Sequence, residues 1–285
     1  MKAPKGLAGV VVDTTSISNV NAKLSQLFYR GEEVSALSEN HSFDEVAHLL
    51  LMDKLPNEQE LKSFQTQEKE NRHLDEATVQ NISTLKNAHP MDALRTAVSV
   101  IGALDHDRTF DNSPKANFSK FLRLYAKIPT AIAYHYRASK GLEFIPPDSS
   151  MTRSENFFQM CFGSLPSEKV LKAFEASMIL YAEHSFNAST FTARVITSTT
   201  SDLYSAITGA IGALKGPLHG GANEQVMYVL KELEQENDVS AWLDRQLKAK
   251  RKIMGFGHRV YKKGDSRVPT MQRYMESLAS DGNFT

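Results

Sequence analysis

The chain has 285 residues, and its 33 Lys and Arg residues balance its 33 Asp and Glu residues, which gives a formal net charge of zero at pH 7. This balance argues against a general nucleic-acid binder or membrane-surface binder, because either would need a surplus of basic residues. The single cysteine, Cys161, excludes an intramolecular disulfide and a thiolate-rich zinc site, so we expect a reducing, cytoplasmic location.

Taken in chain order, strand-like alternation is almost confined to residues 8–16, where the apolar run is too short for a signal peptide or a membrane span. Ser42-Phe-Asp-Glu45 predicts a capping box and a helix that Pro56 would end, and Asn57-Glu-Gln-Glu60 predicts a second helix. Helical spacing of apolar residues predicts further helices over 75–87, 91–104, 115–137, 167–184, 188–214 with a break near 201, 223–235, 240–252 and 270–279. The sequence therefore predicts a mainly α protein.

Three histidines lie at special positions in this pattern. His219 and His258 fall in glycine-rich breaks, and His184 ends a predicted helix. Backbone donors at a helix start would lower the pKa of the His219 imidazole and favour its neutral form as a hydrogen-bond donor to a carbonyl. For any one histidine a structural role is the more frequent alternative. We expect no metal, because the surroundings are basic.

The segment from Arg245 to Gly264 holds eight basic residues and no acidic one. This run flanks Gly255-Phe-Gly257, whose backbone N–H groups could approach a phosphate closely, although a solvated surface is the alternative. Arg267 lies close enough in sequence to His258 to share a pocket, and its guanidinium matches a carboxylate. The alternative for Arg267 is an ion pair at a helix start. These residues indicate a carboxylate substrate, a phosphorylated second substrate and acid–base chemistry.

At these residues the sequence resembles the citrate synthase family. Pro217-Leu-His-Gly-Gly-Ala-Asn-Glu224 and Gly255-Phe-Gly-His-Arg-Val-Tyr261 are similar to its two catalytic histidine segments, and Gly264-Asp-Ser-Arg267 is similar to its Asp-Pro-Arg segment. Further matches are Gly6-Leu-Ala-Gly-Val10, Tyr29-Arg-Gly31, Phe43-Asp-Glu-Val-Ala-His-Leu-Leu50, Leu55-Pro56, His89-Pro-Met91 and Glu183-His-Ser-Phe-Asn-Ala-Ser-Thr-Phe191. The resemblance implies a multi-helical fold with a large domain over residues 1–219 and the beginning of a small domain over residues 220–285.

The resemblance also implies an activity, the condensation of an acyl-CoA with oxaloacetate followed by thioester hydrolysis. It implies that His219 donates to the thioester carbonyl, that His258 polarises the oxaloacetate carbonyl, and that His184 and Arg267 hold oxaloacetate. The implied CoA contacts are Lys252, Ile253, Met254, Gly255 and Phe256, with Arg72 as a further contact. No cofactor is implied, because the CoA thioester is itself a substrate, and relatives act as homodimers.

Two features depart from the family's pattern. In the family, the Asp that removes the acyl α-proton lies C-terminal to anything present here, so we expect the 285 residues alone to be inactive; normal turnover by them would contradict this. Ser266 replaces the usual Pro of Asp-Pro-Arg, and the segment is most similar to the 2-methylcitrate synthase branch. We therefore expect propionyl-CoA to be preferred over acetyl-CoA, a choice that depends on one methylene worth about 1–3 kcal/mol.

Three alternatives to this hypothesis stay open. One is a citrate synthase of the tricarboxylic acid cycle that is specific for acetyl-CoA. Another is a non-catalytic helical module that binds CoA or carboxylates. A third is a structural helical protein whose histidines only satisfy cores and caps. Exchange of the acyl α-proton would separate an enzyme from a binding module.

Overall fold

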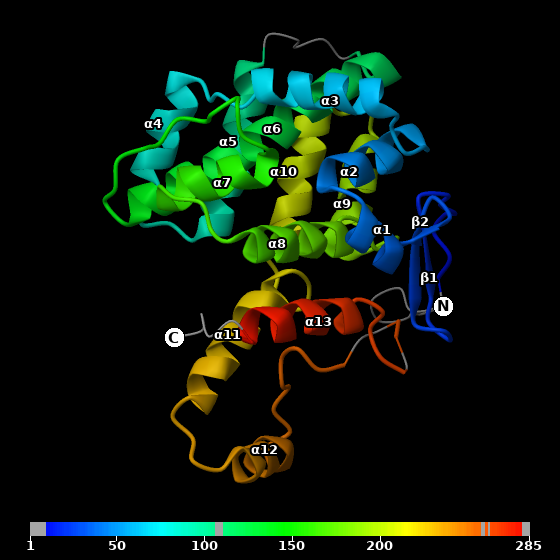
Figure 1. Ribbon diagram of the computed structural model, residues 1–285, viewed down its shortest axis with the longest axis vertical. Coiled ribbons are helices and arrows are strands. Elements are labelled where there is room, and N and C mark those ends of the chain that lie inside the picture. The colour runs from blue at the N-terminus through cyan, green and yellow to red at the C-terminus, as the bar shows by residue number, and fades with distance from the viewer. Residues whose placement is uncertain (1–9, 106–110, 258–259, 262, 281–285) are drawn as a thin grey trace.

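A computed structural model describes residues 10–105, 111–257, 260–261 and 263–280 of the chain (Figure 1). Within these residues the fold is mainly helical, with thirteen helices and three short strands, which confirms the predicted fold class. The strands are β1 (Ser18–Asn21), β2 (Gln26–Tyr29) and β3 (Glu32–Glu33). The helices are α1 (Val34–Asn40), α2 (Phe43–Met52), α3 (Glu58–Glu70), α4 (Glu76–Thr84), α5 (Pro90–Leu104), α6 (Pro114–Ser139), α7 (Arg153–Phe162), α8 (Glu168–Tyr181), α9 (Ala188–Thr197), α10 (Leu203–Leu214), α11 (Gly221–Leu233), α12 (Val239–Lys248) and α13 (Val268–Ala279).

Side-chain caps fix where several helices begin. Both predicted capping boxes are present: Ser42 with Glu45 starts α2, and Asn57 with Glu60 starts α3. Helix α2 ends at Met52, earlier than predicted, because Asp53 adopts a left-handed conformation with φ of 63°. Helices α1 and α7 were not predicted, although Thr152-Arg-Ser-Glu155 carries the same capping signature and starts α7 with a complete capping box.

The predicted strand over residues 8–16 is wrong for the described residues 10–16, which form no strand. The strands come later and form a small antiparallel meander in the order β1-β2-β3, with Ser18 opposite Tyr29. Local alternation did not reveal them because their stability comes from tertiary contacts. Tyr29 is fully buried at the end of β2, and its hydroxyl lies 2.9 Å from the carbonyl oxygen of Ile179 in α8. The sheet therefore docks on the C-terminal end of α8.

The core lies between helices that are distant in sequence. Helix α5 packs against α6 and α10, and α10 packs against α9. One cluster joins Val98 and Ile101 of α5 to Leu124 of α6 and to Tyr204 and Ile211 of α10. In Figure 1 these helices form the upper part of the molecule, and α8 crosses below them. Helix α8 thus covers the lower side of this helical body in Figure 1 and leads directly into the segment that carries His184.

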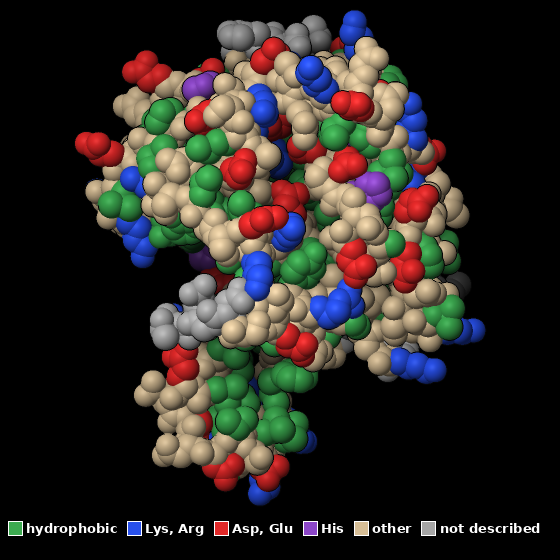
Figure 2. All heavy atoms as spheres, viewed as in Figure 1, with side chains coloured by type: hydrophobic (Ala, Val, Ile, Leu, Met, Phe, Trp, Pro, Cys, Tyr) green, Lys and Arg blue, Asp and Glu red, His purple; other side chains and the backbone are tan. Residues whose placement is uncertain are grey.

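The last three helices lie on the far side of α8 (Figure 1). Helix α13 packs against α8, while α11 and α12 extend away from the body. Exposed apolar side chains gather on α11 and α12, where Figure 2 shows hydrophobic side chains, and they include Met227, Leu230, Leu243 and Leu247. The division into domains at residues 219 and 220 stays a prediction; the described structure places the start of α11 at Gly221.

Candidate active site

His219 lies in a tight turn between α10 and α11. The backbone N–H groups of His219 and Gly221 both donate to the carbonyl oxygen of Gly216, over 2.9 and 3.1 Å. A Cβ atom on residue 221 would lie 2.3 Å from the carbonyl oxygen of Lys215, so only glycine fits there without a backbone shift. These contacts make the turn a compact unit that sets the direction of the His219 side chain.

The imidazole of His219 faces the first turn of α9. The backbone N–H of Ser189 lies 3.2 Å from Nε2 of His219, and the Ser189 hydroxyl lies 2.9 Å from the same atom. A backbone N–H can only donate, so Nε2 presents its lone pair and the neutral ring carries its proton on Nδ1. The N-cap of α9, Asn187, accepts from the N–H of Thr190 over 2.9 Å and fixes this helix start. His219 is therefore held as a neutral ring with one N–H left to donate.

Burial lowers the pKa of His219 from its ordinary value, which confirms the predicted direction. The backbone donor is not the predicted one, however. The N–H that contacts the ring belongs to Ser189 at the start of α9, whereas the sequence indicated the helix that follows His219 itself. A neutral imidazole at this position can donate a hydrogen bond to a developing oxyanion without giving up its proton.

His184 lies in the connection between α8 and α9, three residues beyond the observed end of α8 at Tyr181, so it does not end the helix as predicted. Its Nε2 atom lies 3.1 Å from the hydroxyl of Tyr261, whose side chain is only 5% exposed. The Tyr261 hydroxyl in turn lies 2.8 Å from the hydroxyl of Ser266. Burial raises the pKa of Tyr261, so this hydroxyl keeps its proton at neutral pH.

Arg267 stands at the start of α13, where it makes the ion pair that was the alternative for this residue. Its Nε and Nη2 atoms donate to the two carboxylate oxygens of Asp265 over 2.9 and 2.6 Å. The guanidinium carbon lies 5.4 Å from the ring centre of Tyr181, at the end of α8. The end of α8 therefore brings His184 and Arg267 to the same part of the fold, with Tyr261 and Ser266 between their segments.

The predicted CoA contacts, Lys252 to Phe256, form a loop after α12. Lys252 and Phe256 are exposed, with Phe256 at 83%, and Gly255 has a φ of 91°. The positive charge of the preceding run is partly neutralised, because Arg245 pairs with Glu236 and Arg251 pairs with Glu232 of α11. His258 lies outside the described residues, so its predicted place beside Arg267 stays a prediction.

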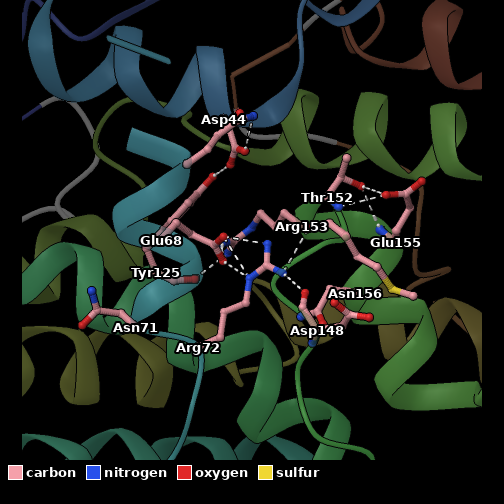
Figure 3. A network of polar contacts seen from close by, with 12 residues as sticks. Asp44, Glu68, Asn71, Arg72, Tyr125, Asp148, Thr152, Arg153, Glu155 and Asn156 are labelled. Carbon is pink, nitrogen blue, oxygen red and sulfur yellow. Dashed lines mark hydrogen bonds and ion pairs between the residues drawn. The ribbon is translucent and has the colours of Figure 1, made fainter. Parts of the chain in front are cut away.

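The structure places Arg72 inside the helical body, apart from the other predicted site residues, so its geometry argues against the CoA contact, which stays a prediction. It is only 2% exposed, and its guanidinium pairs with Glu68 over 2.7 Å while donating to the carbonyl oxygen of Asp148 over 2.7 Å (Figure 3). Arg153 shares the same carboxylate, and its guanidinium lies 3.5 Å from the ring centre of Tyr125. Arg72 is a structural residue, because reaching a ligand would leave Glu68 buried without its main partner.

Other features of the fold lie apart from these residues. An apolar cavity of about 340 Å³ opens between α6, α7, α8 and α10, and none of the predicted site residues lines it. The part of the chain that the structure describes contains no cluster of three His, Cys, Asp or Glu side chains able to hold a metal ion. None of its helices combines the length and the apolar character needed to span a bilayer.

Sequence reasoning missed several residues that contact the predicted ones. Ser189 and Tyr261 hold His219 and His184, and His89 at the start of α5 contacts Glu224 just after the His219 turn. The family-like segments of the sequence include all four contacting residues, but nothing in the local sequence indicates these contacts. The four are His89, Ser189, Tyr261 and Glu224. Only the Pro that follows His89 marks a helix start, and it could have indicated His89 as a cap.

Comparisons with known proteins place the chain among citrate synthases and 2-methylcitrate synthases. The family model described as "Citrate synthase, C-terminal domain" matches residues 6–284. A "Citrate synthase" of Mycolicibacterium smegmatis is 51% identical over 276 residues, covering 96% of this chain and 73% of that protein. A "2-methylcitrate synthase" of Mycobacterium tuberculosis is also 51% identical, over 277 residues, covering 97% of this chain and 70% of that protein.

Solved structures give the same result. A citrate synthase from Thermotoga maritima is 41% identical, with a TM-score of 0.87 over 97% of this chain and 74% of that chain. The citrate synthase from Thermoplasma acidophilum, solved as a ternary complex with carboxymethyl coenzyme A and oxaloacetate, is 28% identical, with a TM-score of 0.91 over 97% of this chain and 73% of that chain.

Proposed function

Because the chain belongs to the citrate synthase family, we propose that it condenses an acyl-CoA with oxaloacetate and releases CoA, giving 2-methylcitrate from propionyl-CoA or citrate from acetyl-CoA. The observation that carries this proposal is the state of His219. A neutral ring whose Nε2 accepts from Ser189 has its only N–H on Nδ1. Such a group suits the stabilisation of an enol formed from a thioester, because it donates a hydrogen bond without supplying a full proton.

The second substrate is oxaloacetate, a dicarboxylate. In this proposal His184 and Arg267 hold it, and His258 polarises its carbonyl. The Arg267 guanidinium pairs with Asp265 and is partly buried, so it is already oriented as a planar donor group. The Tyr261 hydroxyl at 3.1 Å holds the His184 ring in one orientation. Both side chains project from short segments next to α8, so their spacing is set by rigid elements.

The exposed loop from Lys252 to Phe256 is proposed to contact CoA. Its lysine and the neighbouring Lys250 are both exposed, and Gly255 lets the backbone turn with a positive φ against Val226 of α11. A phosphorylated ligand would gain from these charges in a salt-dependent manner. The proposal further includes a cytoplasmic homodimer that needs no cofactor other than its CoA substrate.

For the acyl group, propionyl-CoA is the proposed preference. Its support is Ser266, which replaces the proline of the family's usual motif and contacts Tyr261 over 2.8 Å. An acetyl-CoA-specific enzyme is the second candidate, because a citrate synthase and a 2-methylcitrate synthase are equally identical to this chain, at 51%. A comparison of kcat/KM for the two acyl-CoA substrates decides between them.

The test of the condensation itself uses two measurements. The ¹³C signals of the thioester carbonyl and of the oxaloacetate carbonyl report their polarisation on binding, and thiol release reports the complete reaction. We expect the thioester signal to shift on binding to the wild-type protein and to stay at its free value with His219→Ala. A protein that binds both ligands with no His219-dependent shift of the thioester signal would be a binding module, and the proposal would be overturned.

A further inference from the structure

The N-terminal end of α5 contacts both ends of the turn that carries His219. On one side of the turn, the Nζ atom of Lys215 lies 2.5 Å from a carboxylate oxygen of Asp92. On the other side, a carboxylate oxygen of Glu224 lies 3.1 Å from Nε2 of His89. His89 is the N-cap of α5, and Asp92 lies in its first turn. Two side chains from one helix end thus contact Lys215 and Glu224, which lie on either side of His219 in the sequence.

His89 makes two contacts that a single tautomer satisfies. The backbone N–H of Met91 donates to Nδ1 of His89 over 3.2 Å, which caps α5. Nδ1 must therefore present its lone pair, so the neutral ring carries its proton on Nε2, the atom that faces Glu224. The cap of α5 and the contact to α11 are made by opposite sides of one imidazole, which couples the position of α11 to the start of α5.

Backbone hydrogen bonds within the turn connect the two ends at which these contacts are made. The carbonyl oxygen of Gly216 accepts from both His219 and Gly221, and the N–H of Ala222 donates to the carbonyl oxygen of His219 over 3.0 Å. A displacement of either end is therefore passed to His219 itself. Such a displacement would change the 3.2 Å contact between the N–H of Ser189 and Nε2 of His219, which sets the tautomer of the ring.

We propose that His89 and Asp92 are positioning residues that hold the His219 turn against α9 through Glu224 and Lys215. The inference rests on the proposed function only where it concerns turnover. None of these four side chains touches a substrate in the proposal, and their role is to fix the imidazole where its Nδ1 proton can be used.

A positioning role and a structural role differ in whether loss of the contact lowers the reaction rate or the folding stability. The four side chains are 31–41% exposed, so the Asp92–Lys215 ion pair and the His89–Glu224 hydrogen bond each stabilise the fold only weakly. A catalytic group that is displaced by about 1 Å, in contrast, can lose roughly 10²-fold in rate. Loss of these contacts should therefore change the thermal midpoint little and the behaviour of His219 strongly.

The test is His89→Asn. Asparagine is a good N-cap, so α5 keeps its cap, but its shorter side chain loses the contact with Glu224. We expect the ¹⁵N signals of the His219 ring to show a weakened hydrogen bond at Nε2, and kcat to fall about tenfold or more with little change in KM for oxaloacetate. Glu224→Met, which keeps the length but removes the acceptor, should give the same result, and the double variant should add little.

The matched control is His41→Asn, because His41 pairs with Glu45 over 3.0 Å at a similar exposure but far from the turn. It should leave the His219 signals and kcat unchanged. Unchanged His219 signals and unchanged kcat in folded His89→Asn and Glu224→Met proteins would overturn the inference. If the wild-type protein gives no His219-dependent shift of the thioester signal, the proposed function fails, and the ring-nitrogen signals still decide whether His89 positions His219.

Discussion

The buried ion network of Glu68, Arg72 and Arg153 differs sharply from the loop at Lys252. Both contain basic residues that the sequence assigned to CoA binding. In the network every charge is enclosed and paired with a neighbouring side chain or carbonyl group. In the loop Lys252 is exposed to solvent. The difference shows that a basic side chain stabilises the fold where it is buried and paired, and can bind a ligand only where it is accessible.

The largest expected effect tests the first half of this comparison. Arg72→Ala should lower the free energy of unfolding by about 3–5 kcal/mol, because it leaves Glu68 buried with only a weaker contact to Arg153. Urea unfolding measures the loss, and Lys62→Ala on the exposed side of α3, the helix that carries Glu68, should change little. Unaltered stability combined with weaker acyl-CoA affinity would restore Arg72 as a ligand contact.

A smaller loss of stability is expected from Gly221→Ala, which adds a Cβ atom 2.3 Å from the carbonyl oxygen of Lys215. The forced backbone shift should cost about 1–3 kcal/mol and displace His219 from Ser189. The control is Gly212→Ala in α10, where the added atom would be 3.8 Å from its nearest neighbour, Arg95. Thermal unfolding of both proteins measures the difference, and equal midpoints would contradict the close approach seen in the turn.

Tyr261→Phe should affect binding more than stability. It removes the hydroxyl that contacts His184 and Ser266, a loss of about 0.5–1.5 kcal/mol, which corresponds to roughly 2- to 10-fold weaker oxaloacetate affinity. Isothermal titration measures the affinity. Ser266→Ala should have a smaller effect in the same direction, and Tyr274→Phe on α13 should have none. Equal affinities for wild type and Tyr261→Phe would separate Tyr261 from the site.

Lys252→Ala tests the exposed half of the comparison. Because the side chain is solvated, we expect acyl-CoA affinity to fall by at most about 1 kcal/mol, with the loss shrinking at high salt and stability unchanged. Lys86→Ala, an exposed lysine after α4, is the control. A loss of stability in Lys252→Ala would mean that this loop, like the network, serves the fold.

The smallest expected effect on stability concerns pH. The folded pKa of His219 is lowered by burial, so the unfolded chain binds more protons at pH values between the two pKa values. The stability that His219 contributes through this difference should therefore be fully present above the unfolded pKa of about 6.5. It should be lost as the pH falls through the folded pKa. The ring is only partly buried, which keeps the effect small. His219→Gln should flatten this part of the pH profile of unfolding, and an unchanged slope would show that His219 is not its source.

Much of the helical pattern followed from local signals. The caps at Ser42 and Asn57 predicted the starts of α2 and α3, and the break near residue 201 matches the gap between α9 and α10. The strands were misplaced because β1 and β2 are stabilised by their mutual pairing and by the burial of Tyr29, which no local pattern records. Helix α7 was missed although Thr152 and Glu155 carry a capping signature.

For the candidate site, the sequence by itself determined which residue types are available: His219 in a glycine-rich turn, His184 before a capped helix, and Arg267 at a helix start. Only the tertiary structure decided what surrounds them. It placed the N–H of Ser189 on His219, the hydroxyl of Tyr261 on His184 and Arg72 inside the body. The physical reason is that caps and turns depend on neighbours within a few residues, whereas burial and tautomer depend on groups that folding brings together across 30 to 77 positions of sequence.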